Sequence, residues 1–136
     1  RDALIGTLAG SLDRHVRALD GQPLNARPFD PVPTATGVAY AWRQRIETGA
    51  GAPHPQDPDI IEIRLDSLIG AGPKERMKLF GLGPHTCVGK AVSLSAFRAL
   101  AAFIATCTTA VREVALVPEG NHVLVVPASM TIRVTA

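Results

Sequence analysis

Residues 2–19 carry apolar side chains at helical spacing, with charged side chains between them. The apolar positions are Leu4, Ile5, Leu8, Leu12, Val16 and Leu19. This period predicts an amphipathic helix that ends before Gly21. We expect its apolar stripe to pack against the last predicted helix or against structure outside this chain. A membrane or partner surface is the less favoured alternative.

The next part of the chain has a weaker pattern. Four prolines within residues 21–35 predict an extended or turning path without regular structure. Residues 38–47, VAYAWRQRIE, predict a short helix in which Trp42 is a core or interface anchor. The glycine- and proline-rich residues 49–58 predict a flexible connection.

The second half alternates between clearer patterns. Residues 60–69 alternate apolar and charged side chains, which predicts a strand that could end in a helical turn. The charged residues 74–78 predict a solvated connector, with a docking surface for a redox partner as the alternative. Residues 88–105 predict one long helix, whose apolar stretch 94–105 is expected to be buried, and residues 111–135 predict short strands that form a terminal hairpin. The predicted fold is therefore mixed α and β, mainly helical, in a single segment 1–136.

Composition supports a soluble globular body. The chain has 136 residues, of which 46% are hydrophobic and 19% charged, with a net charge of +2. No apolar run approaches the length of a membrane span, and no targeting segment is visible. Basic residues alternate with acidic ones, which argues against a nucleic-acid surface. Two cysteines give no disulfide framework, so we expect a reducing, cytoplasmic compartment.

The decapeptide FGLGPHTCVG at residues 80–89, which we call the ligand loop, contains the candidate chemistry. Gly81 and Gly83 precede Cys87 and Gly89 follows it, and glycines allow tight turns and close approach to the backbone. A thiolate in such a loop, bonded by backbone N–H groups at the start of a helix, is a good metal ligand. Phe80 can shield the sulfur, and His85 can reach a nearby anionic group.

The ligand loop resembles the haem-binding signature of the cytochrome P-450 superfamily. The resemblance implies that Cys87 is the axial thiolate ligand, and the catalytic residue, of haem b (iron protoporphyrin IX). It also implies that Phe80 packs beside the iron–sulfur bond, that His85 contacts a haem propionate, and that Gly81, Gly83 and Gly89 shape the loop. Arg98 stands where the family often has an arginine, whereas Ala96 replaces a common acidic residue.

The resemblance covers only the last third of the much longer family fold. The family's Glu-x-x-Arg pair does not occur in this chain, and neither does a distal helix with an acid–alcohol pair. We therefore expect a C-terminal portion of a larger haem-thiolate domain. Its upstream part, or a companion chain, would supply the distal face of the pocket.

Other candidate residues have structural interpretations. Cys107 lies in an apolar run and is expected to be a small buried hydrophobe. His15, His54 and His122 show no ligand spacing, so a histidine-based metal site is not expected. Residues 127–130 in the predicted hairpin are candidates for substrate contact, because the family's hairpin returns toward the substrate cavity.

Three functions remain open. The first is a P-450-type monooxygenase, supplied by a redox partner, that inserts oxygen into a small organic substrate, with lipids as one class. The second is a fatty-acid hydroperoxide isomerase or peroxygenase that needs no reductase. GPHTCVGK and PASMTIRV are similar to the P-450 domains fused to fatty-acid dioxygenases. The third is a non-enzymatic haem-binding or relic interaction domain.

Overall fold

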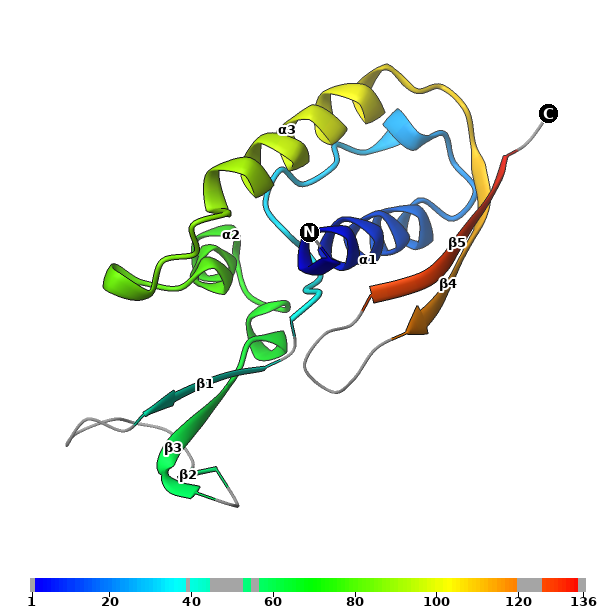
Figure 1. The fold of residues 1–136 in the computed structure, drawn as a ribbon. Coiled ribbons are helices and arrows are strands. Elements are labelled where there is room, and N and C mark those ends of the chain that lie inside the picture. Colours follow the sequence, from blue (N-terminus) through cyan, green and yellow to red (C-terminus); the bar gives the residue numbers. More distant parts are fainter. Residues whose placement is uncertain (1, 39, 45–52, 55–56, 120–125, 135–136) are drawn as a thin grey trace.

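The computed structural model of the chain describes residues 2–38, 40–44, 53–54, 57–119 and 126–134. Helices account for more of these residues than strands do, so the fold is mixed and mainly helical, as predicted. Figure 1 shows the terminal hairpin beside the first helix, while the other sheet extends away from the helices at the lower left. No helix within the described ranges is both long and apolar enough to cross a bilayer.

Helix α1 spans Asp2–Leu19, and its bounds are those predicted. It ends because Asp20 and Gly21 have φ angles of 48° and 79°, which the helix cannot continue through. Val16 is buried against Val111 at the start of strand β4 (Val111–Glu119). The apolar stripe of α1 therefore packs within the chain.

The main core joins α1 to helix α3, which spans Lys90–Thr106. The prediction of a buried helix is wrong for most of α3, since only Phe97 and Ile104 are buried there. Phe29, Phe97 and Ile104 form a buried cluster that is covered by leucines of α1. The rings of Phe29 and Phe97 stack with centroids 6.1 Å apart. The segment after α1 runs between the two helices (Figure 1) and includes the short 3₁₀ helix η1 (Leu24–Ala26). The stripe of α1 thus reaches the last helix, as the sequence predicted.

Two hydroxyl groups of α1 bind the backbone of this extended segment. The amides of Thr34 and Ala35 donate to Ser11 Oγ over 3.1 and 3.2 Å. The amide of Gly37 donates to Thr7 Oγ1 over 2.8 Å. Thr7 and Ser11 are one helical turn apart, so both face the same segment.

The prediction of a helix over residues 38–47 is wrong. Residues Tyr40–Gln44 form strand β1, which pairs antiparallel with strand β3 (Asp57–Arg64) in a register that places Trp42 opposite Glu62. A helix this short is marginal without tertiary support, whereas a neighbouring strand satisfies the backbone of an aromatic-rich segment. Residues 45–47 and the surroundings of the Trp42 side chain lie outside the described part.

The interpretation of residues 49–58 as a flexible connection is also wrong where the structure describes them. Pro53–His54 form strand β2, and β3 already begins at Asp57. The sheet order is β1-β3-β2, with β3 in the centre. The predicted strand within residues 60–69 is confirmed, including its end in a helical turn, the 3₁₀ helix η2 (Asp66–Leu68).

The charged stretch before the ligand loop is helical. Helix α2 spans Pro73–Arg76 and is followed by the 3₁₀ helix η3, Met77–Phe80. At the other end of the chain, β4 pairs antiparallel with β5 (Val126–Val134), with Val114 opposite Ile132. This two-stranded sheet confirms the predicted terminal hairpin and packs against α1.

Candidate functional site

The ligand loop closes on itself through backbone hydrogen bonds. The Cys87 amide donates to the carbonyl oxygen of Phe80 over 2.7 Å. Between them lies the 3₁₀ helix η4, Gly83–His85. The Thr86 amide and hydroxyl both donate to the Gly83 carbonyl, over 3.1 and 2.8 Å. The backbone of the loop therefore fixes where Cys87 lies.

Two of the three predicted loop glycines have conformations that favour glycine. Gly81 has a φ angle of 74°, and a Cβ there would lie 2.2 Å from the carbonyl oxygen of His85. Gly83 has a φ angle of 54° in open surroundings. Gly89 has an ordinary φ of −81°, and a Cβ there would lie 3.6 Å from Cys87 Sγ. Gly89 therefore leaves space beside the sulfur, while Gly81 and Gly83 shape the turn.

Cys87 is exposed and stands just before α3. Its carbonyl oxygen accepts the amide of Lys90 over 3.1 Å, so the first residue of the helix is bonded to the candidate ligand. The helix begins two positions later than the sequence predicted, since residues 88 and 89 form a turn. Within the described ranges, no N–H group donates to Cys87 Sγ, so the hydrogen bonds expected for a thiolate are not formed there.

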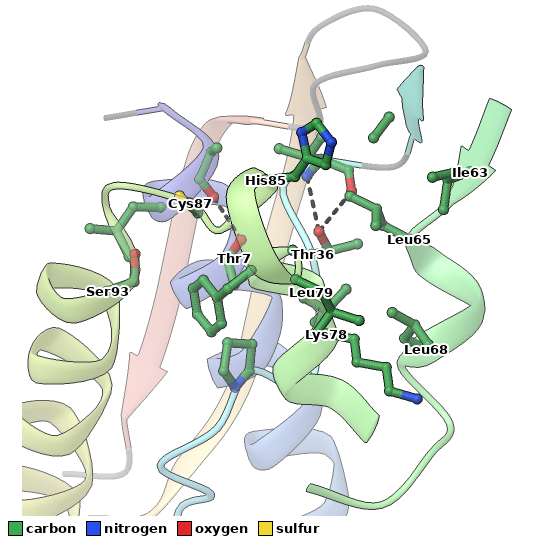
Figure 2. Close-up of a pocket in the computed structure, with 18 residues that line it drawn as sticks. Thr7, Thr36, Ile63, Leu65, Leu68, Lys78, Leu79, His85, Cys87 and Ser93 are labelled. Carbon is green, nitrogen blue, oxygen red and sulfur yellow. Dashed lines mark hydrogen bonds between the residues drawn. The ribbon is translucent and has the colours of Figure 1, made fainter. Parts of the chain in front are cut away.

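A pocket of about 660 Å³ adjoins the ligand loop. Its lining is mainly aliphatic and comes from the start of α1, the segment before β1, strands β1 and β3, the η2 region, η3, the ligand loop and α3. Figure 2 shows Cys87 and Ser93 on one side of this pocket and Ile63, Leu65 and Leu68 on the other. Sequence reasoning missed these aliphatic residues, because their local patterns indicate only core or strand.

Four predicted residues of the ligand loop line this one pocket. They are Phe80, Gly81, His85 and Cys87. Phe80 is buried, with 9% of its surface exposed, whereas His85 and Cys87 are exposed. Lys78 also lines the pocket and forms an ion pair with Glu75. The ligand loop thus brings a thiol, an aromatic ring and an imidazole to one apolar space, and Lys78 of η3 adds an amine.

The prediction of a solvated connector over residues 74–78 is wrong for Arg76. This arginine is buried, with 8% of its surface exposed, and it forms an ion pair with Asp30. Asp30 lies 46 residues away in the sequence, so no local signal reveals the contact. Lys74 and Lys78 are exposed, as predicted.

His15, Cys107 and Arg98 are not among the residues found to line the pocket, and His122 lies outside the described residues. His15 Nε2 lies 3.0 Å from the carbonyl oxygen of Leu24, and its ring meets the Phe29 ring edge-on. Cys107 follows α3 directly and is half-buried, not buried as predicted, and its carbonyl oxygen accepts the Asn25 amide. Arg98 is exposed on α3. Among the described residues, no three His, Cys, Asp or Glu side chains gather as a metal site.

One carboxylate near the pocket has a shifted proton affinity. The hydrogen bonds from Arg64 hold the pKa of the Asp66 carboxyl below its ordinary value of 3.8. Asp66 opens η2, the turn that contains Leu68 of the pocket lining. The Arg64–Asp66 pair is solvent-exposed and therefore contributes little to stability.

Comparisons of the chain with protein-family models, curated proteins and solved structures found no match. Residues 127–130, predicted to contact substrate, are not among the residues found to line the pocket in the described part of the chain.

Proposed function

We propose that this chain is the ligand-loop part of a haem-thiolate oxidoreductase of the cytochrome P-450 type, in which Cys87 is the axial ligand of haem b. The observation that carries this proposal is the position of Cys87, exposed in the wall of an apolar pocket of about 660 Å³. That volume lies within the range of ordinary cofactor and ligand sites, roughly 300–1,000 Å³. A tight loop therefore presents one sulfur to a space that suits a large apolar group.

The residues around the pocket fit haem in their chemistry. A single thiolate is a soft axial ligand for iron, and an aliphatic lining suits the face of a porphyrin. Haem, when bound, supplies an iron centre whose electron-rich thiolate ligand favours cleavage of an O–O bond. Phe80 excludes water from the loop side of the pocket. His85 and Lys78 offer hydrogen-bond donors for the propionates.

The side of the loop that faces solvent supports a further covering element. Val88 is fully exposed and Leu82, which also lines the pocket, is 65% exposed, so the loop around Cys87 presents two apolar side chains to solvent. An upstream part of the same polypeptide or a companion chain would supply the distal wall of the pocket, on the side opposite Cys87. The substrate in this proposal is a small organic molecule, with lipids as one class.

A second candidate is favoured by the apolar character of the pocket. A fatty-acid hydroperoxide isomerase or peroxygenase uses the same Cys87 ligand and takes a long apolar peroxide as its source of oxygen. Such an enzyme needs no reductase. Lys78, at the pocket wall, would bind a carboxylate end group by exchanging it for its present partner Glu75. Turnover of a lipid hydroperoxide without NAD(P)H separates this candidate from the monooxygenase.

The proposal is tested by the absorption spectrum of the longest natural polypeptide that contains this chain, reduced and exposed to carbon monoxide. We expect a Soret band at the red-shifted position of thiolate-ligated iron, and its loss in Cys87→Ser. Cys107→Ser is the matched control and should keep the band, because Cys107 lies at the far end of α3. Absence of haem uptake in all three proteins would contradict the enzyme proposals and leave an interaction domain.

A further inference from the structure

Arg76 is a buried cation at the end of α2. Its Nη1 donates to the carbonyl oxygen of Ala71 over 2.8 Å, and its Nη2 is paired with Asp30 Oδ2. The other carboxylate oxygen of Asp30 accepts the Val32 amide over 2.9 Å. Both carboxylate oxygens are thus bonded, and the arginine is fixed between two separate backbone segments.

The Asp30–Arg76 pair connects the structure on both sides of the ligand loop. Arg76 is followed directly by η3, which ends at Phe80, and the Phe80 carbonyl accepts the Cys87 amide. Asp30 is bonded in the chain to Phe29, whose ring stacks on Phe97 of α3. Since α3 begins just after Cys87, the pair ties the segment before the loop to the helix after it.

The pair is an inefficient source of stability. Arg76 Nε is buried and has no hydrogen-bond partner within the described part of the chain. Removing an arginine from water costs free energy that one carboxylate and one carbonyl only partly offset, and an unmade buried hydrogen bond adds to that cost. A buried charge of this kind is explained better by the geometry that it fixes than by net stability.

We infer that Asp30 and Arg76 are positioning residues that fix the ligand loop and so hold Cys87 at the wall of the pocket. Neither side chain is among the residues found to line that pocket in the described structure. They act through η3 on one side and through the Phe29–Phe97 contact on the other. The consequence for haem ligation rests on the proposed function, whereas the geometry of the loop is testable without haem.

The first experiment measures amide hydrogen exchange in the chain without added haem. In Asp30→Asn and Arg76→Met, the amides of Thr86 and Cys87 should exchange about tenfold faster or more, as loss of a charged hydrogen bond implies. Amides in the middle of α3, such as that of Phe97, should keep their rates. Asp13→Asn and Arg17→Lys change the exposed pair on α1 and serve as matched controls without an effect on the loop.

Two results of this experiment would overturn the inference. One is an unchanged exchange rate at Thr86 and Cys87 in both variants. The other is a uniform acceleration that includes α3, because it would mean that the pair contributes only general stability. Arg76→Lys keeps the positive charge but replaces the two nitrogens that bind Ala71 and Asp30 by a single amino group. The amides of Thr86 and Cys87 should therefore exchange at an intermediate rate.

The second experiment uses the haem-loaded polypeptide. Arg76→Met should lower the fraction of reduced, carbon monoxide-bound protein with the thiolate-type Soret band by about half or more, and Arg76→Lys should restore part of it. If the wild type binds haem and these variants leave its Soret band unchanged, the inference is contradicted, while the proposed function is not. Failure of the wild type to bind haem would contradict the proposed function, while the exchange data would still decide whether the pair fixes the loop.

Discussion

The amide of Cys87 donates to the carbonyl oxygen of Phe80 over 2.7 Å, so one short backbone hydrogen bond joins the first residue of the ligand loop to its cysteine. Phe80 is buried while Cys87 is exposed. The bond therefore connects a residue anchored in the structure to one presented at the pocket wall. Changes that open this turn should alter the position of the sulfur before they unfold the rest of the chain.

Gly81→Ala should disrupt the ligand loop. Its φ angle of 74° is unfavourable for alanine, and the new Cβ would meet the His85 carbonyl oxygen at 2.2 Å. We expect a loss of about 1–3 kcal/mol in the free energy of unfolding, measured by urea denaturation. Haem uptake should fall in parallel.

Gly70→Ala is the control for this change, because nothing lies within 4 Å of the position where its Cβ would be. It should leave stability within about 0.5 kcal/mol of the wild type. Equal stability of the Gly81 and Gly70 variants would show that the loop tolerates another turn.

The helices and the hairpin follow from local pattern, but β1 does not. Residues 2–19 repeat their apolar side chains with one clear period, and the structure follows it. Around Trp42 the spacing allows either a helix or a strand, and pairing with β3 decides between them. The partner strand lies beyond a proline-rich stretch, so the local sequence contains no sign of this pairing.

The ligand loop could be located from sequence, whereas its surroundings could not. Glycines, histidine and cysteine at fixed spacing indicate a tight turn with one sulfur, and the structure forms that turn. The Asp30–Arg76 pair and the bonds from Thr34 and Ala35 to Ser11 join residues 46, 23 and 24 positions apart. Such contacts depend on how the elements pack, which a single sequence does not reveal.

Phe97→Ala should be among the most destabilising changes in the chain. The Phe97 side chain is fully buried and stacks on Phe29, so truncation leaves a cavity between α1 and α3. The expected loss is about 3–5 kcal/mol in the free energy of unfolding. Phe103→Ala, on the same helix but 63% exposed, is the matched control and should cost far less. Similar unfolding midpoints for the two variants would contradict this description of the core.

Ser11→Ala should weaken the contact between α1 and the segment before β1. Ser11 is 1% exposed, and its Oγ accepts both the Thr34 and the Ala35 amides. Removing that oxygen leaves two partly buried N–H groups without this partner, at a cost of about 1–3 kcal/mol in thermal or urea unfolding. Ser95→Ala, at an exposed position of α3, should be nearly neutral. A neutral Ser11 variant would indicate that water replaces the hydroxyl.

The Arg64–Asp66 pair should give a small pH dependence of stability. Because the pKa of Asp66 is lowered in the folded chain, the folded state binds fewer protons than the unfolded state. The stabilisation is therefore fully present above the ordinary pKa of 3.8 and is lost as the pH falls through the lower, folded pKa.

Asp66→Asn removes the titrating group. The difference in melting temperature between wild type and variant should be largest near neutral pH and shrink below pH about 4. Since the pair is exposed, that difference should also shrink in high salt. A difference in melting temperature that grows as the pH falls would mean that folding raises the pKa of Asp66, and it would contradict the lowered pKa of this carboxyl.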